Sequence, residues 1–431
     1  MDHNRRLAYY ILRDVEENKA YSHIALSRSL KNADPQSIPF IKELVYGVTR
    51  YKMYLDFVIS SYIKGSIGKV KPSDLILLRM GLFQLIYMNK VPSHSAVDET
   101  VELAKVFSVG RQGFINAILR EYLRNPDKVQ LPDPKEDLVK YLSIKYSFEP
   151  WIVFMWIREL GEDEARALLE ASNTIPSVTI RANTLKTNGK HLYDRLITRG
   201  YKAERSAHND NVIYVDGGEL ISSNSYKQGL FSIQDEASLE TVKALDPKPG
   251  DTVLDVCAAP GGKTMAIAER MENYGSIYAF DIYRKKLQEI IEQATRLGIE
   301  IVTVKSWDAT VANHAFQEKA DKVLVDAPCS GLGTIRKKPE IKYKAFDDDM
   351  KDLPVKQLKI LNASAEYVKP GGTLVYSTCT IAKRENQNIP KAFLKMHKNF
   401  EKVYEKQLLP SVDGTDGFYI CKMIKKDDIY A

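Results

Sequence analysis

The sequence predicts a multidomain protein with an all-α N-terminal domain, a small α/β domain in the middle and a C-terminal α/β domain of Rossmann-like type. Three observations lead to this fold class. The 431 residues, 44% of them hydrophobic, exceed one ordinary domain and can bury several cores. Apolar residues recur at helical spacing from Arg5 to about Arg124. From Asp246 onward, short apolar runs alternate with helical segments, which is typical of a mostly parallel sheet.

Composition excludes several classes of protein. The opening MDHNRRLAYY lacks the apolar core of a signal peptide, and no stretch approaches the roughly 18 consecutive apolar residues of a membrane span, so we expect a cytoplasmic protein without a membrane partner. The four cysteines have no Cys-x-x-Cys spacing, so neither a disulfide framework nor a metal site is expected. The net charge of +6 suits a polyanionic partner, although many proteins with such a charge bind none. The sequence does not fix the oligomeric state, and a monomer is expected.

The N-terminal helical domain is expected over residues 1–128. Six segments repeat apolar residues at helical spacing: RRLAYYILRDV, AYSHIALSRSL, PFIKELVYGVTRYKMYLDFVISSYI, PSDLILLRMGLFQLIYM, SAVDETVELAKVF and RQGFINAILREYL. Helix breakers separate them, namely Pro35, Gly65, Pro72, Pro92 and Gly110. The simplest interpretation is a helical bundle with its apolar stripes in the core and basic faces in solvent.

The middle domain is expected over residues 141–235, after a linker rich in proline, aspartate and lysine, NPDKVQLPDPKEDLVK. The pattern is helical around WIVFMWIREL and EDEARALLEA, strand-like at SVTIRAN, helical near HLYDRLITRG and strand-like at NVIYV. These segments predict a small α/β domain.

The C-terminal domain, expected over residues 236–431, begins with a strand, TVLDV, that ends in the turn CAAPGGK. Its small residues let the backbone approach a ligand, and Gly261 and Gly262 can adopt conformations closed to other side chains. A nucleoside-triphosphate P-loop would need glycine where Cys257 stands, and a dinucleotide G-x-G-x-x-G is absent. Asp281, Asp308 and Asp326 follow the next three strands, where sheets of this kind bind ligands. Together these features suggest a bound adenosine and a charged sulfonium.

Two resemblances add to this interpretation. Over roughly the first 125 residues the chain resembles the NusB family of helical RNA-binding domains, through RRLAYYILRDVEENKAYSHIALS, ELVYGVTRY, LRMGLFQLIYM, PSHSAVDETVELAK and FINAILR. This resemblance implies phosphate contacts from basic residues, with Arg5, Arg6, Arg111 and Arg120 as candidates among which the sequence does not choose. Over roughly residues 175–431 the chain resembles the RNA cytosine-C5 methyltransferases, through IRANTLK, DVCAAPGGKT, DAPCSGLGTIRKKPE, VKPGG, TLVYSTCT, ENQ and DGFY, where DGFY replaces the common DGFF.

The second resemblance implies a class I methyltransferase domain, an RRM-like middle domain and the cofactor S-adenosyl-L-methionine. The residues that it implies as lining the cofactor are Cys257, Ala258, Ala259, Pro260, Gly261, Gly262, Lys263, Asp281 at the ribose, Asp308 at the adenine, and Asp326 beside both cofactor and base. It implies Cys379 as the nucleophile and Cys329 as the residue that assists release. It also implies Arg181 and Asn183 near the substrate. The role that we expect for Asp326 in catalysis is electrostatic or that of an acid or base.

Read from the residues alone, each cysteine is expected to be a small buried hydrophobe, and we accept that for Cys257 and Cys421. Arg336, Lys337 and Lys338 are either phosphate contacts near the site or a solvated surface run.

The reaction that the two resemblances together imply is methylation of carbon 5 of one cytosine in 16S ribosomal RNA through a covalent cysteine–cytosine intermediate. The target base must be unstacked, which favours a loop or partly unfolded RNA. Two alternatives stay open. One is an RNA-binding or antitermination protein that keeps a methyltransferase domain as a scaffold, against which the intact cysteines argue. The other is the same reaction on transfer RNA or on another ribosomal cytosine.

Overall fold

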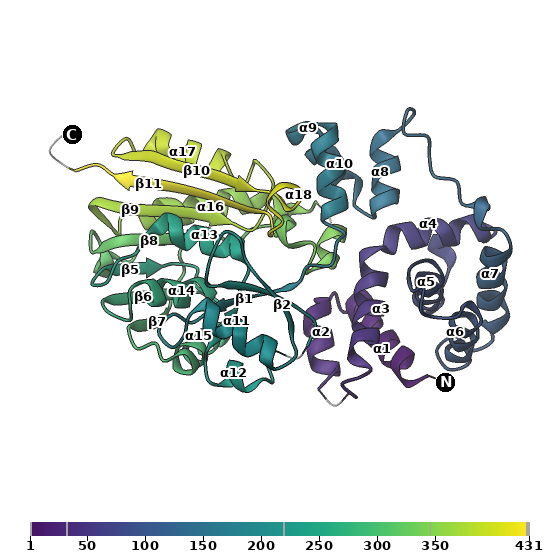
Figure 1. The fold of residues 1–431 in the computed structure, drawn as a ribbon. Coiled ribbons are helices and arrows are strands. Elements are labelled where there is room, and N and C mark those ends of the chain that lie inside the picture. The colour runs from purple at the N-terminus through teal and green to yellow at the C-terminus, as the bar shows by residue number, and fades with distance from the viewer. Residues whose placement is uncertain (1, 32, 219, 345, 428–431) are drawn as a thin grey trace. The chain divides into compact units, whose positions relative to one another are not determined.

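The computed structural model describes residues 2–31, 33–218, 220–344 and 346–427, and its chain divides into two units (Figure 1). The helical unit comprises Met1–Thr174 and Ile335–Ala345, and the sheet unit comprises Ile175–Thr334 and Phe346–Ala431. Within the described residues, none of the helices is both long and apolar enough to cross a membrane.

The helical unit is built from α-helices joined by short connections. Their bounds are α1 (His3–Glu17), α2 (Ser22–Ser29), α3 (Ile38–Arg50), α4 (Lys52–Tyr62), α5 (Pro72–Tyr87), α6 (Ser93–Phe107), α7 (Gln112–Arg124), α8 (Leu138–Tyr146), α9 (Pro150–Leu160) and α10 (Glu162–Ala171), with 3-10 turns at η1 (Ile67–Lys69), η2 (Pro126–Lys128) and η5 (Pro339–Tyr343). The predicted breakers fall at helix ends: Pro72 is the first residue of α5, Pro92 caps α6, and Gly65 has a φ of +99° before α5. The prediction of an all-α N-terminal domain is therefore confirmed.

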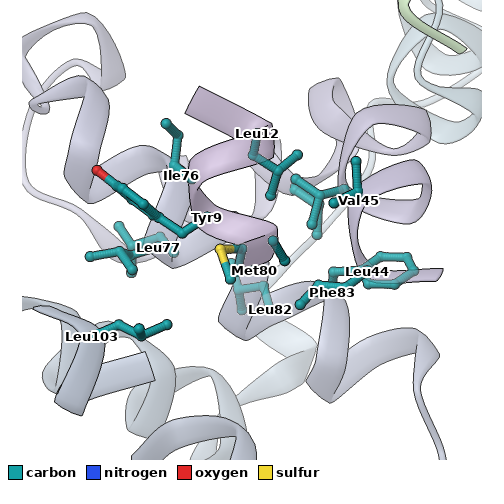
Figure 2. Close-up of a cluster of buried hydrophobic side chains, with 14 of the residues drawn as sticks. Tyr9, Leu12, Leu44, Val45, Ile76, Leu77, Met80, Leu82, Phe83 and Leu103 are labelled. Atoms are coloured by element: carbon teal, nitrogen blue, oxygen red, sulfur yellow. The ribbon is translucent and has the colours of Figure 1, made fainter. Parts of the chain in front are cut away.

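Helix α5 is the centre of this unit because it is apolar on nearly every side and its neighbours cover it. Figure 2 shows part of the core: Tyr9 and Leu12 from α1, Leu44 and Val45 from α3, Ile76, Leu77, Met80, Leu82 and Phe83 from α5, and Leu103 from α6. All of these side chains are less than 5% exposed. A helix that is hydrophobic all round must be buried, which is why α5 lies inside the bundle rather than on its surface.

A segment of the C-terminal sequence, Ile335–Ala345, belongs by its contacts to the helical unit. Lys342 on η5 is fully buried and donates to the carbonyls of Arg50 at 2.9 Å and Tyr146 at 3.0 Å and to Asn173 Oδ1 at 2.5 Å. The grouping by contacts also extends the helical unit through α10. The domain ranges 1–128, 141–235 and 236–431 stay predictions about independent folding units.

The smaller sheet of the sheet unit has the order β2-β3-β1-β4 and is antiparallel throughout. Its elements are β1 (Val178–Ala182), α11 (Gly189–Thr198), β2 (Lys202–Arg205), β3 (Val212–Asp216), α12 (Asn224–Lys227) and β4 (Phe231–Ile233). Ile180, Ile213 and Phe231 from the strands bury their side chains with Leu192 and Leu196 from α11. This confirms the predicted small α/β domain.

The larger sheet has seven strands in the order β10-β11-β9-β8-β5-β6-β7. Its elements are α13 (Glu236–Leu245), β5 (Thr252–Asp255), α14 (Gly262–Arg270), β6 (Ser276–Asp281), α15 (Arg284–Leu297), β7 (Val302–Ser306), η3 (His314–Phe316), β8 (Ala320–Asp326), η4 (Leu332–Thr334), α16 (Asp348–Ala365), β9 (Val368–Thr378), α17 (Asn388–Met396), β10 (Phe400–Leu408), α18 (Pro410–Asp413) and β11 (Phe418–Lys425). The strands β9, β8, β5, β6 and β7 run parallel, and β11 lies antiparallel between β9 and β10.

This topology fixes where the site must be. Helices cover both faces of the sheet, and two separate clusters of buried side chains fill the two sides. The strand order reverses between β5 and β8, since the chain continues from β5 to β6 on one side and later to β8 and β9 on the other. In such sheets ligands bind at the carboxyl ends of the strands beside the reversal.

Candidate active site

The turn after β5 forms the floor of the site. Gly261 precedes α14 with a φ of +101°, which an ordinary side chain disfavours, and its N–H donates to the Ala258 carbonyl at 2.7 Å. The Ala258 N–H in turn donates to the carbonyl of Phe280 on β6 at 2.8 Å. Gly262 does not use this freedom, because it is the first residue of α14 and a Cβ there would meet Gln234 only at ordinary contact distance, 3.5 Å.

Asp281 and Asp308 stand at the same sheet edge, at the ends of β6 and β7. The Asp281 carboxylate accepts the N–H of Ala259 at 3.2 Å and that of Tyr283 at 2.9 Å, so it ties the turn after β5 to the end of β6. Asp308 Oδ1 accepts the N–H of Thr310 at 3.0 Å and its hydroxyl at 2.8 Å. These hydrogen bonds favour the charged form and hold the pKa of Asp308 below its ordinary value.

An ion pair joins the turn to the end of β8. Lys263 Nζ lies 2.6 Å from Asp326 Oδ2, while Asp326 Oδ1 accepts the hydroxyl of Ser377 on β9 at 2.9 Å. Burial alone would lower the pKa of Lys263, but the Asp326 carboxylate outweighs burial and the pKa is raised. The ammonium group also lies 4.8 Å from the ring centre of Phe418, the aromatic residue of the DGFY motif that precedes the final tyrosine.

The structure brings Cys329 and Cys379 together although fifty residues separate them. Their sulfur atoms are 3.3 Å apart, and both residues are partly exposed. The hydrogen bond to Cys379, reinforced by burial, raises the pKa of the Cys329 thiol well above its usual range. Cys421 lies buried on β11, where burial raises its pKa to about 12, as expected of a structural cysteine.

Several residues that position this site were missed by the sequence interpretation. Ser377 orients Asp326, and the side chains of Gln357, Glu385 and Asn386 bond to the two cysteine loops, as described below. The sequence interpretation noted the ENQ motif but assigned it no role. The polar residues that follow the end of a strand were the feature of the sequence that could have indicated a role in the site. Asp255 was also missed. It is buried beneath the turn, accepts the Thr264 hydroxyl at 2.7 Å and has a pKa raised to about 7, chiefly by burial.

Arg181 and Asn183 lie inside the sheet unit. Arg181 is 5% exposed and forms a two-point ion pair with Glu269, with Nη2 at 2.6 Å and Nε at 3.1 Å, and it also bonds to Gln234 and to the Gly262 carbonyl. Asn183 is fully buried and donates at 2.9 Å to two backbone carbonyls, at positions 229 and 297. Direct substrate contact stays a prediction for both, and it would require these bonds to be exchanged.

The basic residues proposed for RNA divide by exposure. Arg6 and Arg120 are exposed, whereas Arg5 is 7% exposed and donates to Gln84 at 2.7 Å, so the suggestion that Arg5 meets phosphate was wrong. Arg111 is partly exposed and pairs with the buried Asp74 at 3.1 Å.

The run at positions 336–338 belongs to the helical unit, and the Arg336 side chain is buried, 8% exposed. The interpretation of this run as a solvated surface is therefore wrong for its first residue. Its carbonyl accepts from the Arg50 guanidinium at 3.0 Å, which anchors the segment in the helical bundle.

Comparison with known proteins places this geometry in a family. Residues 242–424 match the family described as 16S rRNA methyltransferase RsmB/F, residues 2–124 match the NusB family, and residues 148–220 match the ferredoxin-like domain of RsmF/B-like methyltransferases. A protein of Bacillus subtilis strain 168, named probable ribosomal RNA small subunit methyltransferase B, is 38% identical over 98% of both chains. The chain belongs to the 16S rRNA methyltransferase RsmB/F family. A Synechocystis protein of the same name is 33% identical over 92% of this chain and 90% of its own. The crystal structure of PH0851 covers 98% of each chain with 28% identity and a TM-score of 0.83.

Membership in this family makes the protein a small-subunit rRNA methyltransferase that uses S-adenosylmethionine. The residues at the sheet edge fit that cofactor. Asp281 and Asp308 offer carboxylate oxygens that can accept bonds from hydroxyl and amino groups, and Gly261 has no side chain and a positive φ in the turn after β5.

Proposed function

We propose that this protein methylates carbon 5 of a cytosine in 16S ribosomal RNA, with Cys379 as the covalent nucleophile. The observation that carries the proposal is the pair of thiols 3.3 Å apart, formed by Cys329 and Cys379, at the sheet edge where Lys263 and Asp326 also meet. A methyltransferase acting on an oxygen or an exocyclic nitrogen needs no thiol, because those atoms attack a methyl donor directly. Carbon 5 of cytosine is too electron-poor to do so until a nucleophile has added to carbon 6.

The pair is unsymmetrical in a way that suits this chemistry. We propose that the Cys329 S–H donates to Cys379 across the 3.3 Å contact and so stabilises a thiolate on Cys379. The Lys263 ammonium acts in the same direction, since the interaction with Cys379 is one of those that raise its pKa. The Cys379 thiolate then adds to carbon 6, and the electron pair of the ring double bond moves toward carbon 5.

Asp326 has a separate role on the base. Its carboxylate is fixed on one oxygen by Lys263 and on the other by Ser377, so its orientation is set before the substrate arrives. We propose that this carboxyl group accepts from the amino group of cytosine and acts as the acid that delivers a proton to the ring nitrogen, so that this proton neutralises the negative charge that attack places on the ring. When bound, S-adenosylmethionine supplies the methyl group. The proton on carbon 5 must then leave and the bond from carbon 6 to sulfur must break, and Cys329, or a water that it holds, assists this release.

The substrate follows from the relatives and from the N-terminal domain. The curated relatives are named for the small subunit rRNA, and the NusB match covers residues 2–124. We propose that the domain at 1–128 and the small α/β domain at 141–235 bind the RNA that flanks the target cytosine, while the domain at 236–431 carries out the reaction. Bisulfite sequencing of 16S rRNA from a deletion strain tests the target. If every small-subunit cytosine stayed modified, the substrate assignment would be wrong.

Two single substitutions, one at each cysteine of the pair, test the covalent mechanism. Cys379→Ala should abolish methylation and form no adduct, because no sulfur is left to add to carbon 6. Cys329→Ala should still attack but release slowly, so a protein–RNA adduct should accumulate on a denaturing gel after incubation with RNA and S-adenosylmethionine. Cys421→Ala, in the sheet but away from the site, is the matched control and should behave as wild type.

Two outcomes would contradict the mechanism. If Cys379→Ala accumulates the adduct and Cys329→Ala does not, the two roles are reversed. If neither variant loses activity, the mechanism is not covalent.

A further inference from the structure

Two consecutive side chains, Glu385 and Asn386, lie in the loop between β9 and α17, and both are fully buried. The mechanism above does not use them. Their hydrogen bonds go instead to the residues on either side of the two cysteines.

Glu385 serves the loop that carries Cys329. Its Oε2 accepts the backbone N–H of Ser330 at 2.8 Å, directly after the cysteine. The same oxygen accepts Gln357 Nε2 at 3.1 Å, and this amide also donates to the carbonyl of Pro328 at 3.0 Å, directly before the cysteine. One carboxylate, extended by one amide from α16, therefore holds both chain neighbours of Cys329.

Asn386 does the same for Cys379. Its Oδ1 accepts the hydroxyl of Thr378 at 2.5 Å, directly before the cysteine, and its Nδ2 donates to the carbonyl of Thr380 at 3.0 Å, directly after it. The Nδ2 also donates to Gln407 on β10 at 2.8 Å, which fixes the amide orientation. Asn386 is thus anchored to the sheet while it holds the strand end.

The loop that carries Cys329 and the strand end that carries Cys379 are linked to each other and to the sheet. The Ser330 and Thr380 hydroxyls, each one residue beyond a cysteine, bond at 2.7 Å. The Glu385 carbonyl accepts the hydroxyl of Tyr376 on β9 at 2.6 Å. Because a buried carboxylate without its bonds costs free energy, the bonds that Glu385 accepts from Ser330 and Gln357 hold the Cys329 loop in place.

We propose that Glu385 and Asn386 are positioning residues that divide the reaction between them. Glu385 places Cys329 and so serves release, while Asn386 places Cys379 and so serves attack. The proposal rests on the proposed covalent function, and it deepens it by assigning two neighbouring residues to two different steps.

The first test needs no RNA and reads the geometry alone. Phenylarsine oxide binds two thiols that are held side by side, so the wild-type protein should bind one equivalent through Cys329 and Cys379. Glu385→Ala and Asn386→Ala should each weaken binding by about tenfold or more, because a misplacement of about 1 Å is enough to lose that much in a two-point interaction. Glu385→Gln keeps an oxygen that can accept both bonds and should bind nearly as wild type. Gln387→Ala, the third residue of the ENQ motif, bonds to neither loop and is the matched control.

The second test reads the reaction. With RNA and S-adenosylmethionine, Glu385→Ala should accumulate the denaturation-resistant adduct as Cys329→Ala does, whereas Asn386→Ala should form it slowly and accumulate none. Glu385→Gln should restore release, which a loss of folding would not explain. The melting temperature of each variant checks that the chain is folded.

The two proposals fail in different ways. If both alanine variants bind phenylarsine oxide as tightly as wild type, the residues do not set the distance between the thiols and this inference is overturned. Equal adduct levels in the two variants would also overturn the division of roles. If Cys379→Ala still methylates while the arsenical results hold, the covalent function is wrong but the positioning of the thiols stands.

Discussion

Replacing Arg181 with methionine tests how the buried ion pair supports the cofactor turn. The guanidinium pairs with Glu269, which is 5% exposed and lies near the C-terminal end of α14, and it bonds at 3.3 Å to the carbonyl of Gly262, the first residue of the same helix. Removing one partner of a buried pair leaves the other charge uncompensated. In the variant Glu269 must either stay charged without a partner or take up a proton.

The free-energy cost of the substitution can be worked out from the second possibility, protonation of Glu269. Burial already raises the pKa of Glu269 even though Arg181 lowers it, so removing Arg181 raises this pKa further and favours the protonated carboxyl in the folded state. Taking up that proton at pH 7.5 costs about 1.36 kcal/mol for each pH unit above the ordinary value of 4.5, or about 4 kcal/mol. At pH 5.5 the same step costs only about 1.4 kcal/mol. The lost bonds to Gln234 and Gly262 add about 1 kcal/mol each at either pH.

Hydrogen exchange of peptides from β5 and α14 measures the opening free energy where the pair lies. We expect Arg181→Met to lower this opening free energy by about 4–6 kcal/mol at pH 7.5. At pH 5.5 the loss should be smaller by about 2–3 kcal/mol. Arg181→Met combined with Glu269→Leu should recover most of the loss, because it removes the orphaned charge. Arg199→Met, at an exposed position, is the control. Equal losses at both pH values would refute the reasoning, since they would show that the charge of Glu269 is not what the variant leaves behind.

Three further predictions concern the cofactor, pH and RNA. Asp281→Ala should weaken S-adenosylmethionine binding by about 1.5–3 kcal/mol, and an unchanged dissociation constant by calorimetry in the folded variant would remove Asp281 from the site. Because burial raises the pKa of Asp255 to about 7, the folded state holds a proton that the unfolded state releases between about pH 4 and 7, so stability falls as pH rises through that window by at most about 4 kcal/mol. Asp255→Asn should remove this slope in urea unfolding while keeping the Thr264 bond, and a slope that persists would assign it to other groups. Arg6→Gln with Arg13→Gln, on one exposed face of α1, should reduce the slope of log affinity for RNA against log salt by about 2, and filter binding with an unchanged slope would place the phosphate contacts elsewhere.

The sequence by itself determined most helices of the N-terminal domain, although it predicted α3 and α4 as one segment, and it determined that strands and helices alternate after Asp246. Helical periodicity marks α1 to α7 because α5 and its neighbours must bury apolar stripes, and the breakers at Pro72 and Pro92 end up at helix starts since proline is tolerated there. Strand-end acids could be placed at one edge because parallel strands all finish on the same side of a sheet. That rule puts Asp281 and Asp326 at the site from local sequence alone.

Tertiary structure decided which polar side chains face the site and which support it from inside. Arg181, Asn183 and Arg5 carry the residue types of RNA contacts, yet each is buried and engaged by groups from elsewhere in the chain, which no local pattern reveals. The separation of 3.3 Å between Cys329 and Cys379 depends on the pairing of β8 with β9 and on side chains that reach across loops. The segment that carries Lys342 is another contact that no local pattern reveals. It lies within the C-terminal sequence, but Lys342 donates to backbone carbonyls of the helical unit. Periodicity and spacing record the contacts of a residue with its chain neighbours, whereas these bonds join residues 50 to 292 positions apart and exist only once the chain has folded.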